Sequence, residues 1–442
     1  MRAVEQIARE PDRDLAIGWS EPSHPRPTTP PPVLLADATW AGTLAAVRDL
    51  GARGVPVIVA YDKVTAPARW SRYATSVVRC PPPKDATAFL AWLHALGDER
   101  PGCVLCPTSD DVALLVATHL ESLTPRFRLF SPTRQALLRM LDKGQLAAAA
   151  GPAGLKTPAT WSPRDEGELR ELMDELPLPL LMKPRTQALS RMPGKTRIVH
   201  RREEIAPTWR SIREANTHQP AITGIPDIDL PVLQAYHPVA EQVYTVDGFA
   251  DATGRIVAAG ACLKVLQLPR RSGPGLCFES APLDEELLAG LERLCRACGY
   301  RGVFDAEFLI SDDEKLLIDV NPRFYNHMAF ELDRSLPLAW LAYLAAAGDD
   351  GALRQAVSSL PAVTAPSGRI YVHRFPALVQ LSAQRLTGRM TRAETTRWRS
   401  WIARGEAVTD PAYAHGDPLP ALVDVAQWLR HPRSFLRKAA AG

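Results

Sequence analysis

The sequence predicts a protein of the α/β and α+β classes, with a Rossmann-like domain at residues 33–130. Three observations predict it. Near-continuous apolar strands alternate with helices in the first third of the chain, as in a parallel sheet covered by helices. Longer apolar strands then pair as hairpins, and arginine-rich amphipathic helices occupy the end of the chain. We therefore expect several domains built from different layers.

Size and charge limit the classes of function. A chain of 442 residues is long enough for roughly two to four domains. A net charge of +3 is small for this length and argues against a dedicated nucleic-acid binder. No apolar run approaches a membrane span, and the N-terminus has no apolar stretch of the secretory kind. We expect a cytoplasmic protein that binds neither nucleic acid nor membrane.

The seven cysteines include two CxxC pairs, Cys103/Cys106 and Cys295/Cys298. Together these pairs could be read as a four-thiolate zinc site. The first pair lies in an apolar strand and the second at a helix end, whereas zinc knuckles usually lie in polar or glycine-rich turns. The sequence therefore favours buried, reduced cysteines.

The chain begins with an extension at residues 1–32, whose second half holds six prolines between 22 and 32. Such a segment forms neither helix nor sheet and is expected to be extended or disordered. The Rossmann-like domain follows. Its expected strands and helices are, in order, 33–37, 39–53, 55–61, 102–107 and 110–120.

The first strand-to-helix turn of this domain, at 36–42, lacks the glycine pattern G-x-G-x-x-G, so dinucleotide binding is not supported. Asp110 and Asp111 stand where a strand ends and a helix begins. They could cap that helix or line a substrate crevice, and both alternatives remain open.

The middle of the chain mixes helices with strands that pair. A helical stretch at 132–151 contains Lys143, and a strand at 178–184 ends with Lys183. A basic, loop-like segment, 185–202, comes next. The remaining elements are expected at 231–236 (strand), 241–250 and 255–265 (an antiparallel pair), 284–298 (helix), 338–348 (helix) and 369–375 (strand). Residues 346–442 are expected to form a mainly helical C-terminal region.

The most informative stretch is Phe304–Arg323. An apolar strand carries Glu307, an acidic turn follows, and a second apolar strand carries Asp319, Asn321 and Arg323. Because side chains alternate along a strand, the last three residues face the same way. A hairpin would bring Glu307 onto that same face.

This combination of side chains suits a metal ion and a phosphate. Carboxylate and amide oxygens such as those of Glu307, Asp319 and Asn321 are the ligands that Mg²⁺ prefers. The planar guanidinium of Arg323 matches a phosphate oxygen. The alternative is an ordinary polar-edged hairpin in which Asp and Asn serve the turn.

The order of these features resembles the ATP-grasp superfamily over roughly residues 33 to 345. The segment from Gly302 to Arg323 is similar to the family's metal-binding signature, G-x-x-x-x-E-F followed by E-x-N-P-R. Residues 139–158 resemble the family's helix that contains an Asp-Lys pair and leads to G-x-x-x-P. The family's fold implies an ATP-grasp domain at 131–345, with two ATP-clasping lobes at about 142–235 and 236–345. Residues 71–81 and 106–111 resemble the N-terminal domain of the carboxylate–amine ligase branch, which includes D-aspartate-ligase-like enzymes.

The resemblance also implies residue roles. ATP would contact Lys143, Lys183 and Lys264, the adenine hinge would lie at Gln234 and Tyr236, and Glu241 would bind the ribose. Glu307, Asp319 and Asn321 would hold Mg²⁺, with Mn²⁺ as an alternative ion. Arg323 and Lys264 would act in catalysis. One departure is Asp319, where the family more often has Glu, which is one methylene longer.

The function implied is an ATP-dependent carboxylate–amine (or carboxylate–thiol) ligase. It would make an amide through an acyl phosphate and release ADP and phosphate. Its partners would be a small carboxylate and an amine, and the resemblance also allows a homodimer. Two alternatives are a carboxylase-like enzyme that activates bicarbonate and a non-catalytic nucleotide-binding protein. No motif specifies the acid or the amine.

Overall fold

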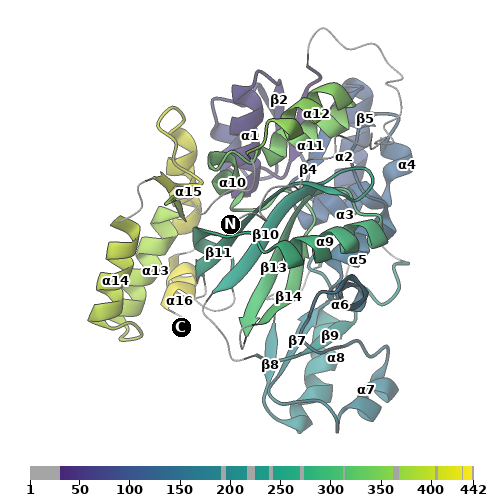
Figure 1. Ribbon diagram of the computed structural model, residues 1–442, viewed down its shortest axis with the longest axis vertical. Helices are drawn as coiled ribbons and strands as arrows, with labels where there is room; N and C mark the ends of the chain where they lie inside the picture. Colours follow the sequence, from purple (N-terminus) through teal and green to yellow (C-terminus); the bar gives the residue numbers. More distant parts are fainter. Residues whose placement is uncertain are drawn as a thin grey trace, which may run out of the picture.

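The computed structural model describes residues 30–190, 196–216, 224–237, 242–268, 273–311, 314–361, 368–403, 407–430 and 432–440. In these residues the strands form three sheets, of five, four and seven strands. Figure 1 shows the seven-stranded sheet in the centre, with the N-terminal sheet at one end of the molecule and the four-stranded sheet at the other. The C-terminal helices lie along one side.

The N-terminal domain is a parallel sheet in the order β3-β2-β1-β4-β5. All four residues of β1 are buried, as expected for a strand covered on both faces. The predicted Rossmann-like domain is therefore confirmed. Its elements are β1 Val33–Ala36, α1 Ala41–Ala52, β2 Val57–Tyr61, η1 Pro67–Trp70, β3 Ser76–Arg79, α2 Ala86–Glu99, β4 Cys103–Pro107, α3 Asp110–Thr118, α4 Leu120–Leu123 and β5 Phe127–Arg128.

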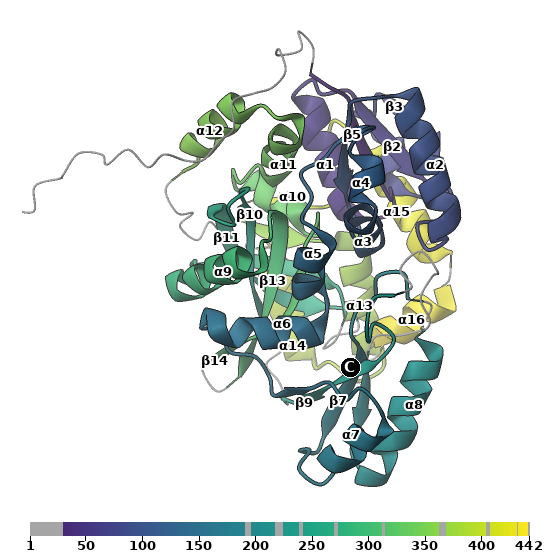
Figure 2. The same ribbon diagram turned by 90° about the vertical axis from the view of Figure 1, so that its right-hand side faces the viewer.

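The next segment forms an antiparallel sheet in the order β6-β9-β7-β8, seen at the lower end of the molecule in Figure 2. Trp209 of α8 is buried in its core. The expected loop 185–202 is partly wrong, because residues 197–199 form β8 and pair with β7. The elements are α5 Arg134–Leu141, α6 Lys143–Ala150, η2 Gly151–Ala153, β6 Thr160–Trp161, α7 Glu166–Leu172, β7 Leu180–Pro184, β8 Arg197–Val199, η3 Arg202–Glu204, α8 Ile205–Ala215 and β9 Pro231–Ala235.

The central sheet has the order β14-β13-β10-β11-β12-β15-β16. The expected antiparallel pair is present as β10 and β11, and the expected hairpin as β13 and β14. The elements are β10 Val243–Ala250, β11 Ile256–Gln267, β12 Gly275–Ala281, α9 Glu285–Cys298, β13 Gly302–Ser311, β14 Glu314–Asn321, α10 Met328–Asp333, α11 Leu338–Ala347, α12 Asp350–Ser358, β15 Ile370–Val372, α13 Arg374–Leu386, α14 Arg392–Ala403, β16 Val408–Thr409, α15 Leu419–Leu429 and α16 Pro432–Ala440.

The two faces of the central sheet differ in chemistry. Tyr244 and Val246 of β10 face a hydrophobic core that α5, α6 and α9 cover. Thr245 and Asp247, one residue along, point to the opposite face, which carries buried polar groups. Because the strand alternates with a period of two, β10 separates the apolar core from a polar site.

The C-terminal region is helical, as predicted, but it also contributes β15 and β16 to the edge of the central sheet. The expected strand at 369–375 is limited to three residues because α13 begins at Arg374. In the described residues, no helix is long and apolar enough to cross a membrane.

Candidate active site

The β13–β14 hairpin places its polar residues in two rows on one face. Glu307 lies directly opposite Asp319, and Asp305 lies opposite Asn321. A register shift follows Glu307, so that Phe308 pairs with Leu317. This bulge lets β14 keep Leu317 in the hydrophobic core while Asp319 faces the polar side. The two carboxylates therefore converge as the sequence predicts.

Each of these carboxylates is paired with an ammonium group from another element. The Nζ of Lys264, on β11, lies 2.7 Å from Oε2 of Glu307. The Nζ of Lys143, at the start of α6, lies 2.9 Å from Oδ1 of Asp319. Burial disfavours both charged ammonium groups, but the facing carboxylates outweigh it and raise the pKa of each lysine. Both lysines are therefore cationic at neutral pH.

Lys143 is positioned by a buried ion pair at the beginning of its helix. Asp142 caps α6 by accepting from the backbone N–H groups of Gly144 and Gln145. The guanidinium of Arg185, which follows β7, donates to Asp142 at 2.8 Å. The backbone N–H of Lys143 also donates to the carbonyl of Arg185. These contacts join α6 to the end of β7 and aim the first residue of the helix at the hairpin.

Lys183, near the end of β7, lies in the same region. Its ammonium donates to Oε1 of Gln234 at 2.9 Å, and the amide of Gln234 donates to Thr160. Burial, followed by the positive charge of Lys143, lowers the pKa of Lys183 to about 8. Among the described residues, Lys183 has no carboxylate within ion-pair distance, unlike Lys143 and Lys264.

Arg323 connects the hairpin to the N-terminal domain. Its Nε donates to Oδ1 of Asp110 at 2.8 Å, and its terminal nitrogen donates to Oδ1 of Asn321 at 2.9 Å. The amide of Asn321 in turn donates to Asp305. Burial disfavours the guanidinium, but Asp110 outweighs burial and raises the pKa of Arg323.

The contacts of Asp110 and Asp111 exclude one of their two interpretations, that of a helix cap, and leave the substrate crevice as a prediction. Ser109, not either aspartate, caps α3 by accepting from Val112. Asp110 borders the site through Arg323. Asp111 accepts a hydrogen bond from the backbone N–H of Leu189. Burial is the main cause that raises the pKa of Asp111 to about 6.

The structure brings together most of the predicted residues, and their roles remain predictions. Tyr236 follows β9 directly and is partly exposed, whereas Gln234 is buried against Lys183. Glu241 lies outside the described residues. Sequence reasoning missed the buried Asp305, although its position two residues before Glu307 on an apolar strand was a signal.

The residues present fit a magnesium ion. Glu307 and Asp319 offer anionic oxygens on facing positions, and Asn321 adds an amide oxygen. Hard oxygen donors of this kind suit Mg²⁺. Oδ1 of the neighbouring buried Asp305 has no hydrogen-bond partner among the described residues, so the region has acceptor capacity beyond what its own cations use.

All seven cysteines are free and buried, in agreement with the prediction of reduced thiols. Cys103 and Cys106 lie on β4, whereas Cys295 and Cys298 lie on α9. Burial raises the pKa of Cys103 and Cys106 to about 12. Thiols of this kind stay protonated and unreactive at neutral pH.

Among comparisons with known proteins, only solved structures show a similarity to this chain, and that similarity is one of fold. No family model matches the chain, and no curated protein matches it. Among solved structures, the chain is similar to the biotin carboxylase domain of 2-oxoglutarate carboxylase from Hydrogenobacter thermophilus, a dimer solved with MgADP, ADP and bicarbonate. Identity is 16%, the match covers 71% of this chain and 69% of that chain, and the TM-score is 0.56.

Two further solved structures are similar over comparable lengths. N5-carboxyaminoimidazole ribonucleotide synthetase from Thermus thermophilus is 18% identical, with coverage of 76% and 80% and a TM-score of 0.52. L-amino acid ligase from Bacillus licheniformis is 14% identical, with coverage of 72% and 75% and a TM-score of 0.52. At these identities the likeness concerns the arrangement of the chain in space.

Proposed function

We propose that this chain, which has the ATP-grasp fold, is an ATP-dependent carboxylate–amine ligase. One observation carries the proposal: two facing carboxylates, an amide and four cationic side chains surround one polar sheet face. They come from α6, β7, β11, β13, β14 and the segment that follows β14. The cations are Lys143, Lys183, Lys264 and Arg323. A nucleoside triphosphate would bring negative charge to the cationic side chains, and a divalent ion would bring positive charge to the carboxylates.

Two groups of residues would bind the metal ion and the phosphates of ATP. Glu307, Asp319 and Asn321 would hold Mg²⁺, which when bound adds positive charge beside the phosphates. Lys143 and Lys183 would bind phosphate oxygens as point charges, and Gln234 holds Lys183 in place for this. ATP and Mg²⁺ are supported further by a similar structure that was solved with MgADP.

The proposed reaction has two steps. An oxygen of the substrate carboxylate attacks the γ-phosphorus of ATP, the bond to the bridging oxygen breaks, and ADP leaves. The amine nitrogen then attacks the acyl carbon, inorganic phosphate leaves with its oxygen, and the nitrogen loses a proton. Lys264 and Arg323 would stabilise the charge on the transferring phosphoryl group and on the acyl phosphate.

Hydroxylamine tests the proposal because it intercepts acyl phosphates. Enzyme, MgATP and a panel of carboxylic acids that includes amino acids and bicarbonate should release ADP with one class of acid. With hydroxylamine in place of the amine, the same acid should yield a hydroxamate and ADP together. Bicarbonate as the only active acid would favour the carboxylase alternative.

The nucleotide product decides between mechanisms. An adenylating enzyme would also give a hydroxamate, but with AMP and pyrophosphate as the other products. That outcome would rule out the acyl-phosphate mechanism. If nucleotide binds but no acid or amine stimulates ADP release, the alternative of a non-catalytic nucleotide-binding protein would stand instead.

A further inference from the structure

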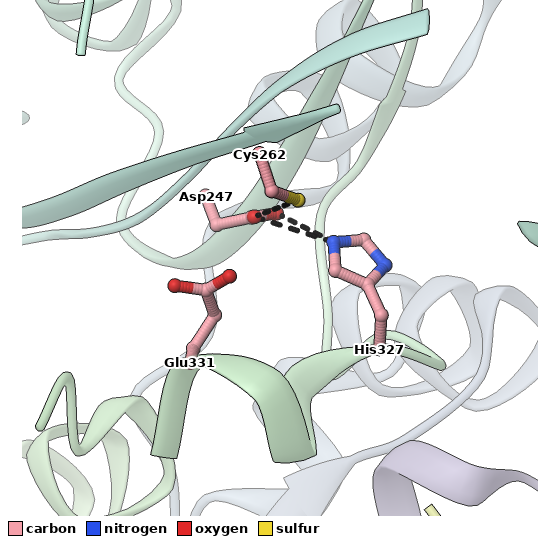
Figure 3. A group of neighbouring side chains, drawn as sticks. All are labelled: Asp247, Cys262, His327 and Glu331. Atoms are coloured by element: carbon pink, nitrogen blue, oxygen red, sulfur yellow. Dashed lines mark hydrogen bonds and ion pairs between the residues drawn. The ribbon is translucent and has the colours of Figure 1, made fainter. Parts of the chain in front are cut away.

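A second group of polar side chains lies on the same sheet face, beside the candidate active site. Figure 3 shows Asp247 of β10, Cys262 of β11, His327 and Glu331 pointing toward one another. Each offers one atom that could bind a metal ion, and these atoms all lie within 4.8 Å of one another. All four residues are buried. None of them belongs to the proposed ATP and Mg²⁺ site.

The fold brings these four residues together from distant parts of the chain. Asp247 and Cys262 lie on adjacent strands, while His327 directly precedes α10 and Glu331 lies within it. Gly260, the register partner of Asp247, allows the helix to approach. A Cβ at Gly260 would lie 3.0 Å from Oε2 of Glu331, which is closer than most such contacts allow.

Contacts within the group orient the atoms that could bind a metal ion. Nε2 of His327 lies 3.2 Å from both carboxylate oxygens of Asp247. Sγ of Cys262 lies 3.7 Å from Oδ2 of the same carboxylate. The imidazole of His327 stacks on the ring of Phe278 with centroids 4.2 Å apart. The imidazole is therefore held with one nitrogen directed at the carboxylate.

Glu331 is already paired within the group, because the guanidinium of Arg334 is bonded at 2.5 Å to both of its carboxylate oxygens. Two further buried atoms, Oδ1 of Asp305 and the hydroxyl of Tyr325, lack a hydrogen-bond partner among the described residues.

Both of these residues adjoin the group. Asp305 is the register partner of Asp247, and the ring of Tyr325 lies 4.5 Å from that of His327. Unpartnered polar atoms are costly in a protein interior. A cation bound beside them would offset that cost.

We propose that Asp247, Cys262, His327 and Glu331 bind a divalent transition-metal ion, with Zn²⁺ the ion that this donor set fits best. Thiolate and imidazole are donors that zinc accepts and magnesium does not favour. The charges of the ion and of Arg334 would balance one thiolate and two carboxylates. Zinc bonds are about 2.0–2.3 Å long, and the four candidate ligand atoms already lie within 4.8 Å of one another.

Four protein ligands with no open position are typical of a structural zinc site. The ion would tie β10 and β11 to α10, immediately after the segment that carries Arg323. Its expected role is to hold that segment against the central sheet. The inference goes beyond the proposed function, since it would stand if the chain formed no amide bond.

Metal content tests the site directly. Wild-type protein equilibrated with Zn²⁺ and then desalted should retain about one zinc ion per chain by elemental analysis. The Co²⁺-substituted protein should show a thiolate-to-cobalt charge-transfer absorption band. Cys262→Ser should lose that band, and Cys262→Ser combined with His327→Asn should lose the stoichiometric ion.

The matched control is Cys277→Ser. Cys277 is also a buried free cysteine of this sheet, but it packs in the hydrophobic core on the other face. The Cys277→Ser protein should keep both the ion and the cobalt band. Chelator should lower the melting temperature of wild type and of this control, but not that of the double variant.

Two outcomes would overturn the proposal. One is wild-type protein that retains neither Zn²⁺ nor Co²⁺ above background after equilibration. The other is a Cys262→Ser protein, folded by circular dichroism, whose cobalt spectrum equals that of wild type. ADP release is not needed for either measurement, so failure here is distinct from failure of the ligase proposal.

Discussion

At the scale of single residues, the carboxylates of the candidate magnesium site are already held by cations of the protein. Lys264 pairs with Glu307 and Lys143 with Asp319. A buried ion pair contributes little net stability, but removing one partner leaves the other charge buried and unpaired. The same side chains therefore affect both stability and the proposed chemistry, and the two effects have to be separated by experiment.

Glu307→Gln should abolish acid-dependent ADP release and also lower the free energy of unfolding by roughly 2–4 kcal/mol, because the buried ammonium of Lys264 loses its counter-charge. Asp319→Asn should abolish ADP release with a smaller loss of stability, since its pair with Lys143 is more exposed. Urea denaturation and an ADP assay measure the two effects.

The double variant Glu307→Gln, Lys264→Met is the control for charge. It should recover stability relative to Glu307→Gln, because no charge is left unpaired, while remaining inactive. ATP turnover at the wild-type rate in Glu307→Gln and in Asp319→Asn would show that the metal assignment is wrong.

Lys183→Ala should weaken MgATP binding by roughly 1–3 kcal/mol, the value of a charge-assisted hydrogen bond. The pKa of Lys183 is lowered to about 8, so the side chain loses its charge as the pH rises through that value. Affinity for MgATP should therefore fall above about pH 8, and binding there should take up a proton.

Calorimetry in two buffers of different ionisation enthalpy measures the affinity for MgATP and the number of protons taken up on binding. Wild type should show the proton uptake, and Lys183→Ala should not. Lys63→Ala, a change at an exposed lysine of the N-terminal domain, is the control and should behave as wild type. Equal affinity and equal proton uptake in Lys183→Ala would remove Lys183 from the nucleotide site.

At the scale of elements, the beginning of α6 and the bulge in β14 do the positioning. The helix starts at the candidate site because Asp142 caps it, and the same carboxylate binds Arg185. The bulge keeps Leu317 in the core and turns Asp319 to the polar face. In both cases a local backbone feature, a helix cap or a bulge, sets the direction in which a charged side chain points.

Asp142→Asn should keep an oxygen for the helix cap but lose the charge opposite the buried Arg185, at a cost of roughly 3–5 kcal/mol. Asp142→Ala should cost about 1 kcal/mol more, because the cap is lost as well. Thermal unfolding orders these variants. Asp165→Ala, which removes the exposed cap of α7, should cost less than either, and the opposite order would contradict the positioning role of Asp142.

At the scale of the whole molecule, polar contacts add to the hydrophobic cores that the N-terminal and central sheets share. Arg323, two residues after the central hairpin ends, reaches Asp110 of the N-terminal domain. The C-terminal region is joined to the same domain by Asp417, which accepts from Arg48, Ser71 and the backbone of Arg72. The C-terminal helices are thus attached both to the sheet edge, through β15, and to the N-terminal domain.

Asp417→Ala should lower the free energy of unfolding by roughly 2–4 kcal/mol, because Arg48 and the donors around it lose a buried acceptor. Limited proteolysis should then cut the C-terminal region faster than in wild type. Glu175→Gln, a change at an exposed carboxylate, is the control. An unfolding midpoint equal to that of this control would contradict the joining role of Asp417.

Much of the candidate site follows from local patterns in the sequence. The alternation of Asp319, Asn321 and Arg323 gives their common direction, because a strand has a period of two. Continuous apolar runs predict the parallel N-terminal sheet for a similar reason, since strands buried on both faces have no polar side. The family resemblance adds the lysines, whose positions a single strand or helix does not connect.

Which side chains pair with one another was decided by the tertiary structure. The pairing of Lys264 with Glu307, of Arg323 with Asp110, and of Asp142 with Arg185 joins residues far apart in the chain. The short strand β8 inside an expected loop depends on pairing with β7. The group of Asp247, Cys262, His327 and Glu331 shows no motif, because strand register and helix packing, rather than spacing along the chain, bring its members within reach of one ion.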